Sequence, residues 1–281
     1  MAQELLIINN FINEKDILKI NKELNKIFEQ PLLNGYVKGS IFSIDKKTYQ
    51  VRECFLPIQN INSVNLLEIA ITIHKKIFKT SDDMILTNLM VNSEKGNHNE
   101  LKMHTDNRID MIRATLYLTD TDKNSGGFYY VKNSSNRDYY VHHEVDNITK
   151  KKLENDIIDC SGKAGDLIIF NSYGFHGKYK CINERRTIIF EFQKRNTKYP
   201  KSTININNLK LSKYVLDNMD ILMPGEYKES YTDHGSDVFN EKYLLQKNYL
   251  IKSTKILFEY LKFNILNKLN KLKNFLKKKI L

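Results

Sequence analysis

Cysteine is scarce in this chain of 281 residues, and the three cysteines follow no recognisable spacing. Cys54, Cys160 and Cys181 lie far apart, and no pair of them forms a C-x-x-C motif. An odd number of cysteines without a disulfide framework favours reduced thiols, and so a cytoplasmic protein. The N-terminal sequence Met-Ala-Gln-Glu-Leu-Leu lacks the charged and apolar regions of a secretory signal. No apolar run reaches the ~18 residues that a membrane-spanning helix needs.

Most of the chain also carries little net charge, although the total is +11. Residues 250–281 contain nine lysines and one glutamate, a net charge of +8, which leaves +3 for all the other residues. The near-neutral body offers no basic face with arginines and stacking aromatics, so we expect no nucleic-acid partner.

Residues 249–281 differ from the body in pattern as well as in charge. Apolar side chains recur there at steps of three and four, and lysines fill the other positions. This pattern predicts a basic amphipathic helix or helix pair. Such a tail packs on the body or on a second copy of the chain, or it contacts the inner face of an anionic membrane as a peripheral element.

Hydrophobic periodicity predicts a mainly β fold with flanking helices, of the α+β class. Helical periods cover 13–28 and 65–79, and Asn13 is in position to cap the first helix. Strand-like segments separated by turns occur at 5–8, 84–92, 110–119, 127–132, 166–171 and 186–193. Short strands at this spacing predict a double-stranded β-helix, a jelly-roll barrel.

We expect three parts along the chain. The double-stranded β-helix domain with its N-terminal helices spans 1–200, and the helical tail spans 249–281. Residues 201–248 connect them and carry no recognisable motif.

The candidate chemistry begins at His104-Thr105-Asp106, which follows a polar loop and precedes a strand. Side chains two residues apart on an extended chain point to the same face, so the histidine and the aspartate can reach one ion. His176 follows the strand at 166–171, with small residues on both sides. Two imidazoles and one carboxylate can hold one face of a ferrous ion and leave three positions open. We therefore predict His104, Asp106 and His176 as the metal ligands and catalytic residues.

An arginine ten residues beyond the second histidine is the candidate anchor for a co-substrate. The residues in phase with Arg186 on its strand are more apolar than those in phase with Arg185, so we expect Arg186 to point into the barrel and Arg185 outward. A buried arginine needs an anion, which is either a protein carboxylate or a dicarboxylate co-substrate. Thr115 and Tyr117 share one face of the strand after the H-x-D motif. We expect Tyr117 to hold the far carboxylate of that co-substrate and Thr115 to line the pocket.

Between about residues 84 and 195, the order of these motifs resembles that of the Fe(II)/2-oxoglutarate-dependent dioxygenases. The shared features, in chain order, are His104-Thr105-Asp106, the turn at 124–127, the segment 165–170, His176-Gly177 and Arg186. The similarity is greatest to the phytanoyl-CoA dioxygenase-like and prolyl-hydroxylase-like branches. It implies a double-stranded β-helix, Fe(II) held by His104, Asp106 and His176, 2-oxoglutarate held by Arg186, and O2 as a further substrate.

Three functions remain open after this comparison of patterns. The first is hydroxylation of a small molecule coupled to oxidative decarboxylation of 2-oxoglutarate, and membrane contact by the tail would favour a glycan-linked or lipid-linked substrate. The second is a cupin-like sugar or metabolite binder, which would need no buried cation opposite the metal. The third is a peptidyl hydroxylase of the prolyl type. A homo-oligomer is compatible with each of them.

Overall fold

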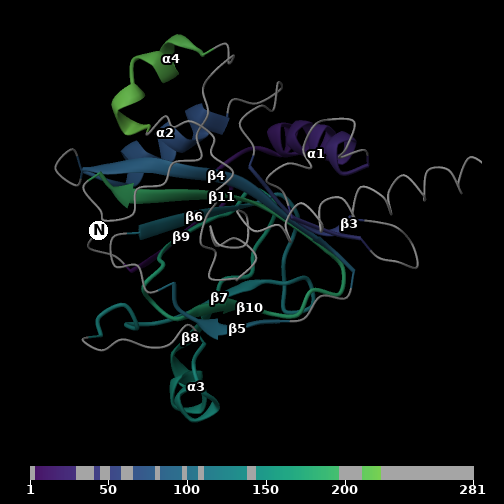
Figure 1. Cartoon of the computed structure of the whole chain (residues 1–281), viewed down its shortest axis with the longest axis vertical. Helices are drawn as coiled ribbons and strands as arrows, with labels where there is room; N and C mark the ends of the chain where they lie inside the picture. Colours follow the sequence, from purple (N-terminus) through teal and green to yellow (C-terminus); the bar gives the residue numbers. More distant parts are fainter. Residues whose placement is uncertain are drawn as a thin grey trace, which may run out of the picture.

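The computed structural model describes most of the first 195 residues and one short helical segment after them. The described ranges are 4–29, 41–44, 51–57, 66–79, 83–96, 100–106, 111–137, 144–195 and 211–222. The predicted tail at 249–281 lies outside them, as does most of the predicted connector. Two antiparallel sheets face each other in the centre of the molecule, and helices lie outside them (Figure 1).

The larger sheet is built around a long central strand, β11. In spatial order its seven strands are β1 (Leu5–Ile8), β9 (Leu167–Asn171), β6 (Met111–Tyr117), β11 (Glu184–Lys194), β4 (Met84–Lys95), β3 (Val51–Pro57) and β2 (Ile41–Ile44). β11 pairs with β4 along its whole length and with β6 on its other side. Strands that are distant in sequence are therefore neighbours, and their side chains meet on both faces of the sheet.

The smaller sheet has four short strands and lies below the larger one in Figure 1. Its spatial order is β5 (Leu101–His104), β10 (His176–Lys178), β7 (Phe128–Val131) and β8 (Ile157–Asp159). The short helices α3 (Asn147–Leu153) and η2 (Glu154–Asp156) precede β8, on the side away from the larger sheet (Figure 1). Asp146 caps α3, because its Oδ1 accepts hydrogen bonds of 2.9 Å from the backbone N–H groups of Ile148 and Thr149.

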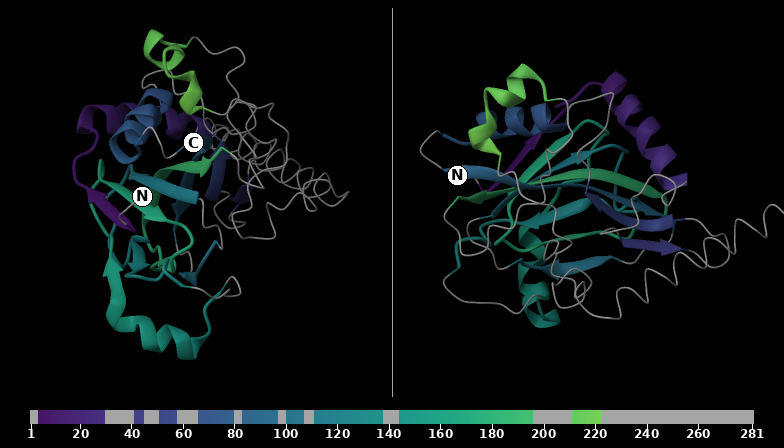
Figure 2. Two further views of the ribbon diagram at one scale, coloured as in Figure 1. Left: turned by 90° about the vertical axis from the view of Figure 1, so that its left-hand side faces the viewer. Right: turned by 45° about the horizontal axis from the view of Figure 1, so that its top comes forward.

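Helices cover the outer face of the larger sheet, as the two views of Figure 2 show. They are α1 (Glu14–Glu29), α2 (Leu66–Ile77), α4 (Lys213–Leu216) and η3 (Met219–Ile221). α1 begins after Asn13, whose Oδ1 accepts a 3.0 Å hydrogen bond from the backbone N–H of Asp16. Ile20 and Leu24 of α1 and the buried residues of α2 join the main hydrophobic cluster with the sheet, because an amphipathic helix is stabilised mainly by burial of its apolar stripe.

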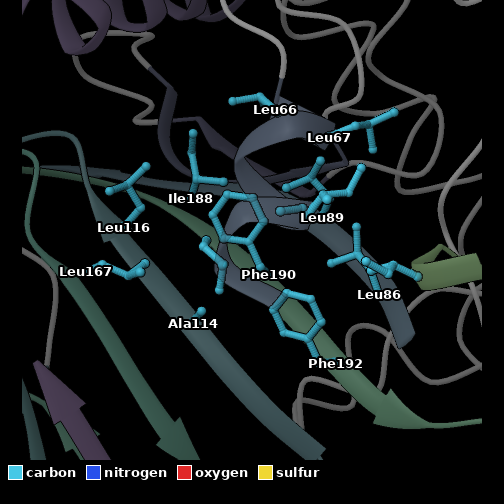
Figure 3. Close-up of a cluster of buried hydrophobic side chains, with 14 of the residues drawn as sticks. Leu66, Leu67, Leu86, Leu89, Ala114, Leu116, Leu167, Ile188, Phe190 and Phe192 are labelled. Carbon is cyan, nitrogen blue, oxygen red and sulfur yellow. The ribbon is translucent and has the colours of Figure 1, made fainter. Parts of the chain in front are cut away.

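The two faces of β11 differ sharply in polarity. Ile188, Phe190 and Phe192 join the helices in the main hydrophobic cluster, which Figure 3 shows in close-up. The intervening residues face the smaller sheet, and Thr187 and Glu191 among them are buried polar groups. The space between the two sheets is thus partly polar, although it is as well buried as the helix-covered side. A polar interior of this kind is expected where a fold builds a binding site.

The predicted elements agree with those of the structure. The predicted helices correspond to α1 and α2, and the six predicted strands correspond to β1, β4, β6, β7, β9 and β11. Cys160 and Cys181 are buried and form no disulfide within the described part of the chain. None of the helices described is long and apolar enough to cross a membrane.

Candidate metal centre

The predicted ligands converge at one edge of the smaller sheet. His104 is the last residue of β5 and His176 is the first residue of β10, and antiparallel pairing places the two opposite each other. Asp106 follows β5, and its backbone N–H bonds to the carbonyl oxygen of Ser172, 3.1 Å away in the turn that leads to β10. One ligand atom from each of the three side chains lies within 4.8 Å of the other two. The structure thus brings His104, Asp106 and His176 together, and their role as metal ligands stays a prediction.

Both imidazoles are oriented by the backbone. Nδ1 of His104 lies 2.8 Å from the carbonyl oxygen of Lys102, and Nδ1 of His176 lies 2.9 Å from the carbonyl oxygen of Gly174. A carbonyl only accepts, so Nδ1 carries the proton in each ring and Nε2 carries the lone pair. Nε2 of His176 is 3.6 Å from Oδ2 of Asp106. A backbone carbonyl beside Nδ1 fixes the tautomer of a histidine and leaves its Nε2 available to a metal.

Burial keeps the second histidine neutral. His176 is almost completely buried, and this burial, together with the neighbouring His104, lowers the pKa of His176 to about 3. Asp106 acts in the opposite direction but is outweighed. A neutral imidazole is the form that binds a metal, so the ring needs no deprotonation above acidic pH.

The donor set fits a divalent transition metal. Two neutral imidazole nitrogens and one carboxylate form the facial triad that non-haem Fe(II) sites use, and the first-row divalent ions share a preference for these donors. Among the residues that the structure describes, the site offers three ligands and no thiolate, whereas a structural zinc site has four ligands.

The carboxylate of Asp106, a candidate ligand, belongs to a buried network of charged side chains. Nη1 of Arg113 lies 2.7 Å from Oδ2 of Asp106, and Nη2 and Nε of the same guanidinium lie 2.7 and 2.8 Å from Oε1 of Glu191. Oε2 of Glu191 in turn accepts a 2.8 Å hydrogen bond from Asn88. Arg113 and Glu191 are paired residues of β6 and β11, and Asn88 is the partner of Glu191 on β4. Three strands of the larger sheet therefore fix the position of a ligand that follows a strand of the smaller one.

Arg186 does not point into the barrel, and the expectation that it would is wrong. Its Nη1 donates hydrogen bonds of 2.9 Å to the side-chain oxygens of Asn21 and Asn25 on α1, and its Nη2 lies 2.6 Å from Oε1 of Glu184. The apolar set in phase with Arg186 was correctly recognised as buried, but it is buried under the helices. The alternation correctly predicts which residues of the strand share a face. The prediction of which face points into the barrel is wrong.

Arg185 takes the inward position instead. Its side chain is buried, and its Nε has no hydrogen-bond partner among the residues that the structure describes. Gly126 leaves the space for it, because a Cβ at that glycine would lie 2.8 Å from Cδ of Arg185. Oγ1 of Thr187, two residues along the same face, is also buried without a partner in the described ranges. Arg185 and Thr187 therefore place a cation and a hydroxyl donor on the same buried face of β11.

The two residues expected beside the arginine also lie on the inner face of β6, but Tyr117 has a different partner. Its hydroxyl donates to the carbonyl oxygen of Cys160 at 2.9 Å and accepts from the backbone N–H of Phe128 at 3.3 Å. The single phenolic proton is thus used to join the two sheets, and burial raises the pKa of Tyr117 to about 12. The expected role of Tyr117 in holding a carboxylate is therefore withdrawn. Thr115 is buried on the same face, and its expected place in the pocket stays a prediction.

Comparisons with known proteins bear on the fold. EctD from S. alaskensis, in a structure with 2-oxoglutarate and 5-hydroxyectoine, is 14% identical over 68% of this chain and 72% of that chain, with a TM-score of 0.54. The non-heme alpha-ketoglutarate-dependent carbocyclase SnoK from nogalamycin biosynthesis is 12% identical over 75% of this chain and 87% of that chain, with a TM-score of 0.53. The epimerase SnoN of the same biosynthesis is 10% identical over 68% and 78% of the two chains, also with a TM-score of 0.53. The chain has the double-stranded β-helix fold. No protein-family model and no curated protein sequence matches it.

Within this double-stranded β-helix, sequence reasoning missed the residues that surround the ligands. Arg185 was expected to point outward, and the pairing of Arg113 with Glu191 depends on a strand register that no local pattern predicts. One signal was present: Arg185, Thr187 and Glu191 alternate as polar residues on a strand whose other face is apolar. Such a strand is buried on both faces here, and its polar face is the one that lines the site.

Proposed function

We propose that this protein is an Fe(II)- and 2-oxoglutarate-dependent oxygenase that hydroxylates a small molecule. The observation that carries this proposal is the approach of His104, Asp106 and His176 to within shared coordination reach at the mouth of a barrel. Inside the same barrel, Arg185 is a buried cation whose Nε has no partner among the described residues. Three such ligand side chains alone are compatible with several activities. The buried cation of Arg185 favours the activities that use an anionic co-substrate.

Each residue has a distinct task in this proposal. His104, Asp106 and His176 would hold Fe(II) on one face, which supplies the activation of O2 when the co-substrate is bound. Arg185 would bind the far carboxylate of 2-oxoglutarate, with the hydroxyl of Thr187 as a second donor. The aromatic cluster of Phe128, Tyr130 and Phe170 between the sheets keeps water from the interior.

The overall reaction balances without any further reductant. Substrate, O2 and 2-oxoglutarate give hydroxylated substrate, succinate and CO2, so that one oxygen atom enters the product and the other enters succinate. Asp106 supports hydroxylation in particular, because a carboxylate at this position occupies a coordination site that the related halogenases leave to a halide.

The proposed substrate is a small molecule. Membrane contact by the basic tail would favour a glycan-linked or lipid-linked metabolite. SnoK and SnoN are named as enzymes of nogalamycin biosynthesis, and EctD has been solved with 5-hydroxyectoine. These likenesses are analogies of fold, which agree with a small substrate but do not identify one.

Anaerobic titration tests the proposal directly. Fe(II)-loaded protein is titrated with 2-oxoglutarate, and we expect a weak visible metal-to-ligand charge-transfer band that saturates at one equivalent. The band should be absent in His104→Ala, because one imidazole ligand is lost. A folded wild-type protein that binds Fe(II) but gives no band would favour the cupin-like binding protein, which needs no dicarboxylate.

A further inference from the structure

Arg137 lies next to the metal site, in the turn that follows β7, and its guanidinium is held in an aromatic sandwich. Its Cζ is 3.9 Å from the ring centre of Tyr173 and 4.4 Å from the ring centre of Phe175. These two residues lie three positions and one position before His176, in the turn that precedes β10. The guanidinium therefore stacks on the segment that delivers the second histidine.

The donors of Arg137 reach both ligand-bearing turns. Nη2 donates to Oγ1 of Thr105 at 2.9 Å, and Nη1 donates to the carbonyl oxygen of Tyr173. Thr105, which is fully buried, stands between His104 and Asp106 in the sequence. Its hydroxyl also donates to the carbonyl oxygen of Tyr173 at 2.8 Å. One guanidinium, one hydroxyl and one carbonyl thus form a closed triangle between the first two ligands and the third.

The turn after β7 also anchors Arg137 and the segment before His176. Nη1 of Arg137 also donates to the carbonyl oxygen of Ser134 at 3.0 Å. Oγ of Ser134 accepts a 2.7 Å hydrogen bond from the backbone N–H of Phe175, the residue immediately before His176. The arginine is accordingly anchored at one end to the β7 turn and at the other end to both ligand segments.

We propose that Arg137 is a positioning residue for the metal centre, which sets the separation of the His104–Asp106 turn from the turn that carries His176. This inference rests on the proposed function, in that the three ligands must bind a divalent metal. Arg137 acts on the ligands through Thr105 and Tyr173, to which its guanidinium donates hydrogen bonds. Interactions that orient metal ligands in this way typically change metal affinity by about 10- to 100-fold when they are removed.

Arginine is suited to this role in a way that lysine is not. The planar guanidinium can lie against two rings and still direct separate N–H groups to two acceptors, whereas an ammonium is a compact charge with no plane to stack. Arg137→Lys therefore keeps the charge but removes the geometry. Thr105→Val removes the shared hydroxyl, keeps the shape and leaves the arginine in place.

Co(II) binding tests the inference without any measurement of activity. Wild type, Arg137→Lys and Thr105→Val are titrated with Co(II), and its d–d absorption spectrum, its affinity and the metal-induced rise in Tm are recorded. We expect about tenfold weaker binding and an altered spectrum in both variants. The double variant should lose less than the two single losses combined, because both changes break the same triangle. Arg195→Lys is the matched control, since the Arg195 side chain is about half exposed and contacts Asp83 instead.

The possible outcomes separate the two proposals. If wild type binds Co(II) and both variants bind it with the same affinity and spectrum, the positioning role of Arg137 is overturned and the proposed function stands. If wild type binds no divalent metal, both proposals fail. A variant that only lowers the Tm of the metal-free protein, with an unchanged metal-induced rise, indicates a purely structural role and also overturns the inference. Should Arg137→Lys not fold, Thr105→Val alone decides by the same criteria.

Discussion

Nη1 of Arg113 and Oδ2 of Asp106 form an ion pair at 2.7 Å, in a part of the barrel where both side chains are almost fully buried. Oδ2 is also the oxygen that lies 3.6 Å from Nε2 of His176. The candidate metal ligand is therefore oriented by a fixed cation as well as by its own backbone. Such preorganisation lowers the conformational entropy that is lost when a ligand set closes on an ion.

The first prediction concerns the stability of this ion pair. Arg113→Met leaves Asp106 and Glu191 as buried carboxylates without their cation, and breaking a buried pair in this way typically costs about 3–5 kcal/mol. The free energy of unfolding from urea titration measures the loss. Lys19→Met breaks the Lys19–Asp16 pair on the surface of α1, whose side chains are 42% and 32% exposed, and should cost less than about 1 kcal/mol. Equal losses in the two variants would contradict the assignment of Arg113 to a buried network.

A second prediction separates the two adjacent arginines of β11. Arg185→Met should weaken 2-oxoglutarate binding by at least about tenfold, because a charge-assisted hydrogen bond to a buried carboxylate contributes about 1.5–3 kcal/mol. Arg186→Met should leave that affinity unchanged but lower the free energy of unfolding, because the strand loses its bonds to Asn21 and Asn25 of α1. Calorimetry on the Mn(II)-loaded, oxygen-free protein measures the affinity, and urea titration measures the stability. The reverse pattern would restore Arg186 as the anchor.

The contrast between these arginines shows what periodicity can and cannot determine. Alternation along 186–193 correctly grouped Ile188, Phe190 and Phe192 on one face, because a strand places every second side chain on the same side. The inner face was misassigned because apolar residues were taken to mark the barrel interior. In this double-stranded β-helix the helices cover the other face of the larger sheet, so its apolar side lies under them and the polar side lines the site.

The proximity of the three candidate ligands was predictable for a different reason. His104 and Asp106 are two residues apart, so their side chains were expected on one face. The placement of His176 beside them was expected from the order of the motifs along the chain. Arg113, Arg137 and Glu191 have no such local marker. Their roles arise from strand register and from a turn packed across the barrel mouth, which are long-range pairings that no short window of sequence contains.

The third prediction tests the reassigned tyrosine. Tyr117→Phe leaves the carbonyl of Cys160 and the N–H of Phe128 without their buried partner, which should lower the free energy of unfolding by about 1–3 kcal/mol. The affinity for 2-oxoglutarate should stay within a factor of two of wild type, since the phenolic proton is already donated to Cys160. Tyr214→Phe, at a residue that is 39% exposed, serves as the control and should change stability by less than about 0.5 kcal/mol. A selective loss of 2-oxoglutarate binding in Tyr117→Phe would support the original expectation.

The fourth prediction follows from the pKa of His176 in the metal-free protein. Burial lowers this pKa to about 3 in the folded state, whereas an unfolded histidine titrates near about 6.5. Below that pH the unfolded chain binds a proton that the folded chain does not, so stability falls as the pH decreases from about 6.5 toward 3. The slope for this group approaches about 1.4 kcal/mol per pH unit. Urea titrations with a chelator between pH 6.5 and 5 should therefore show a shallower slope in His176→Asn, and identical slopes would refute the buried neutral state.

The last prediction concerns the basic tail at 249–281, which lies outside the described residues. If the tail is a peripheral membrane element, the full-length protein should sediment with vesicles that contain anionic lipid and not with purely zwitterionic ones. Each lysine near the headgroups contributes about 1 kcal/mol, so replacement of Lys271, Lys273, Lys277 and Lys278 by glutamine should weaken binding by well over tenfold. Added salt should weaken wild-type binding as well, because exposed charges are screened. If the tail instead packs on the body or on a second copy, vesicle binding should be absent. Leu269→Asp and Leu272→Asp would then disrupt that packing and change the sedimentation coefficient of the protein.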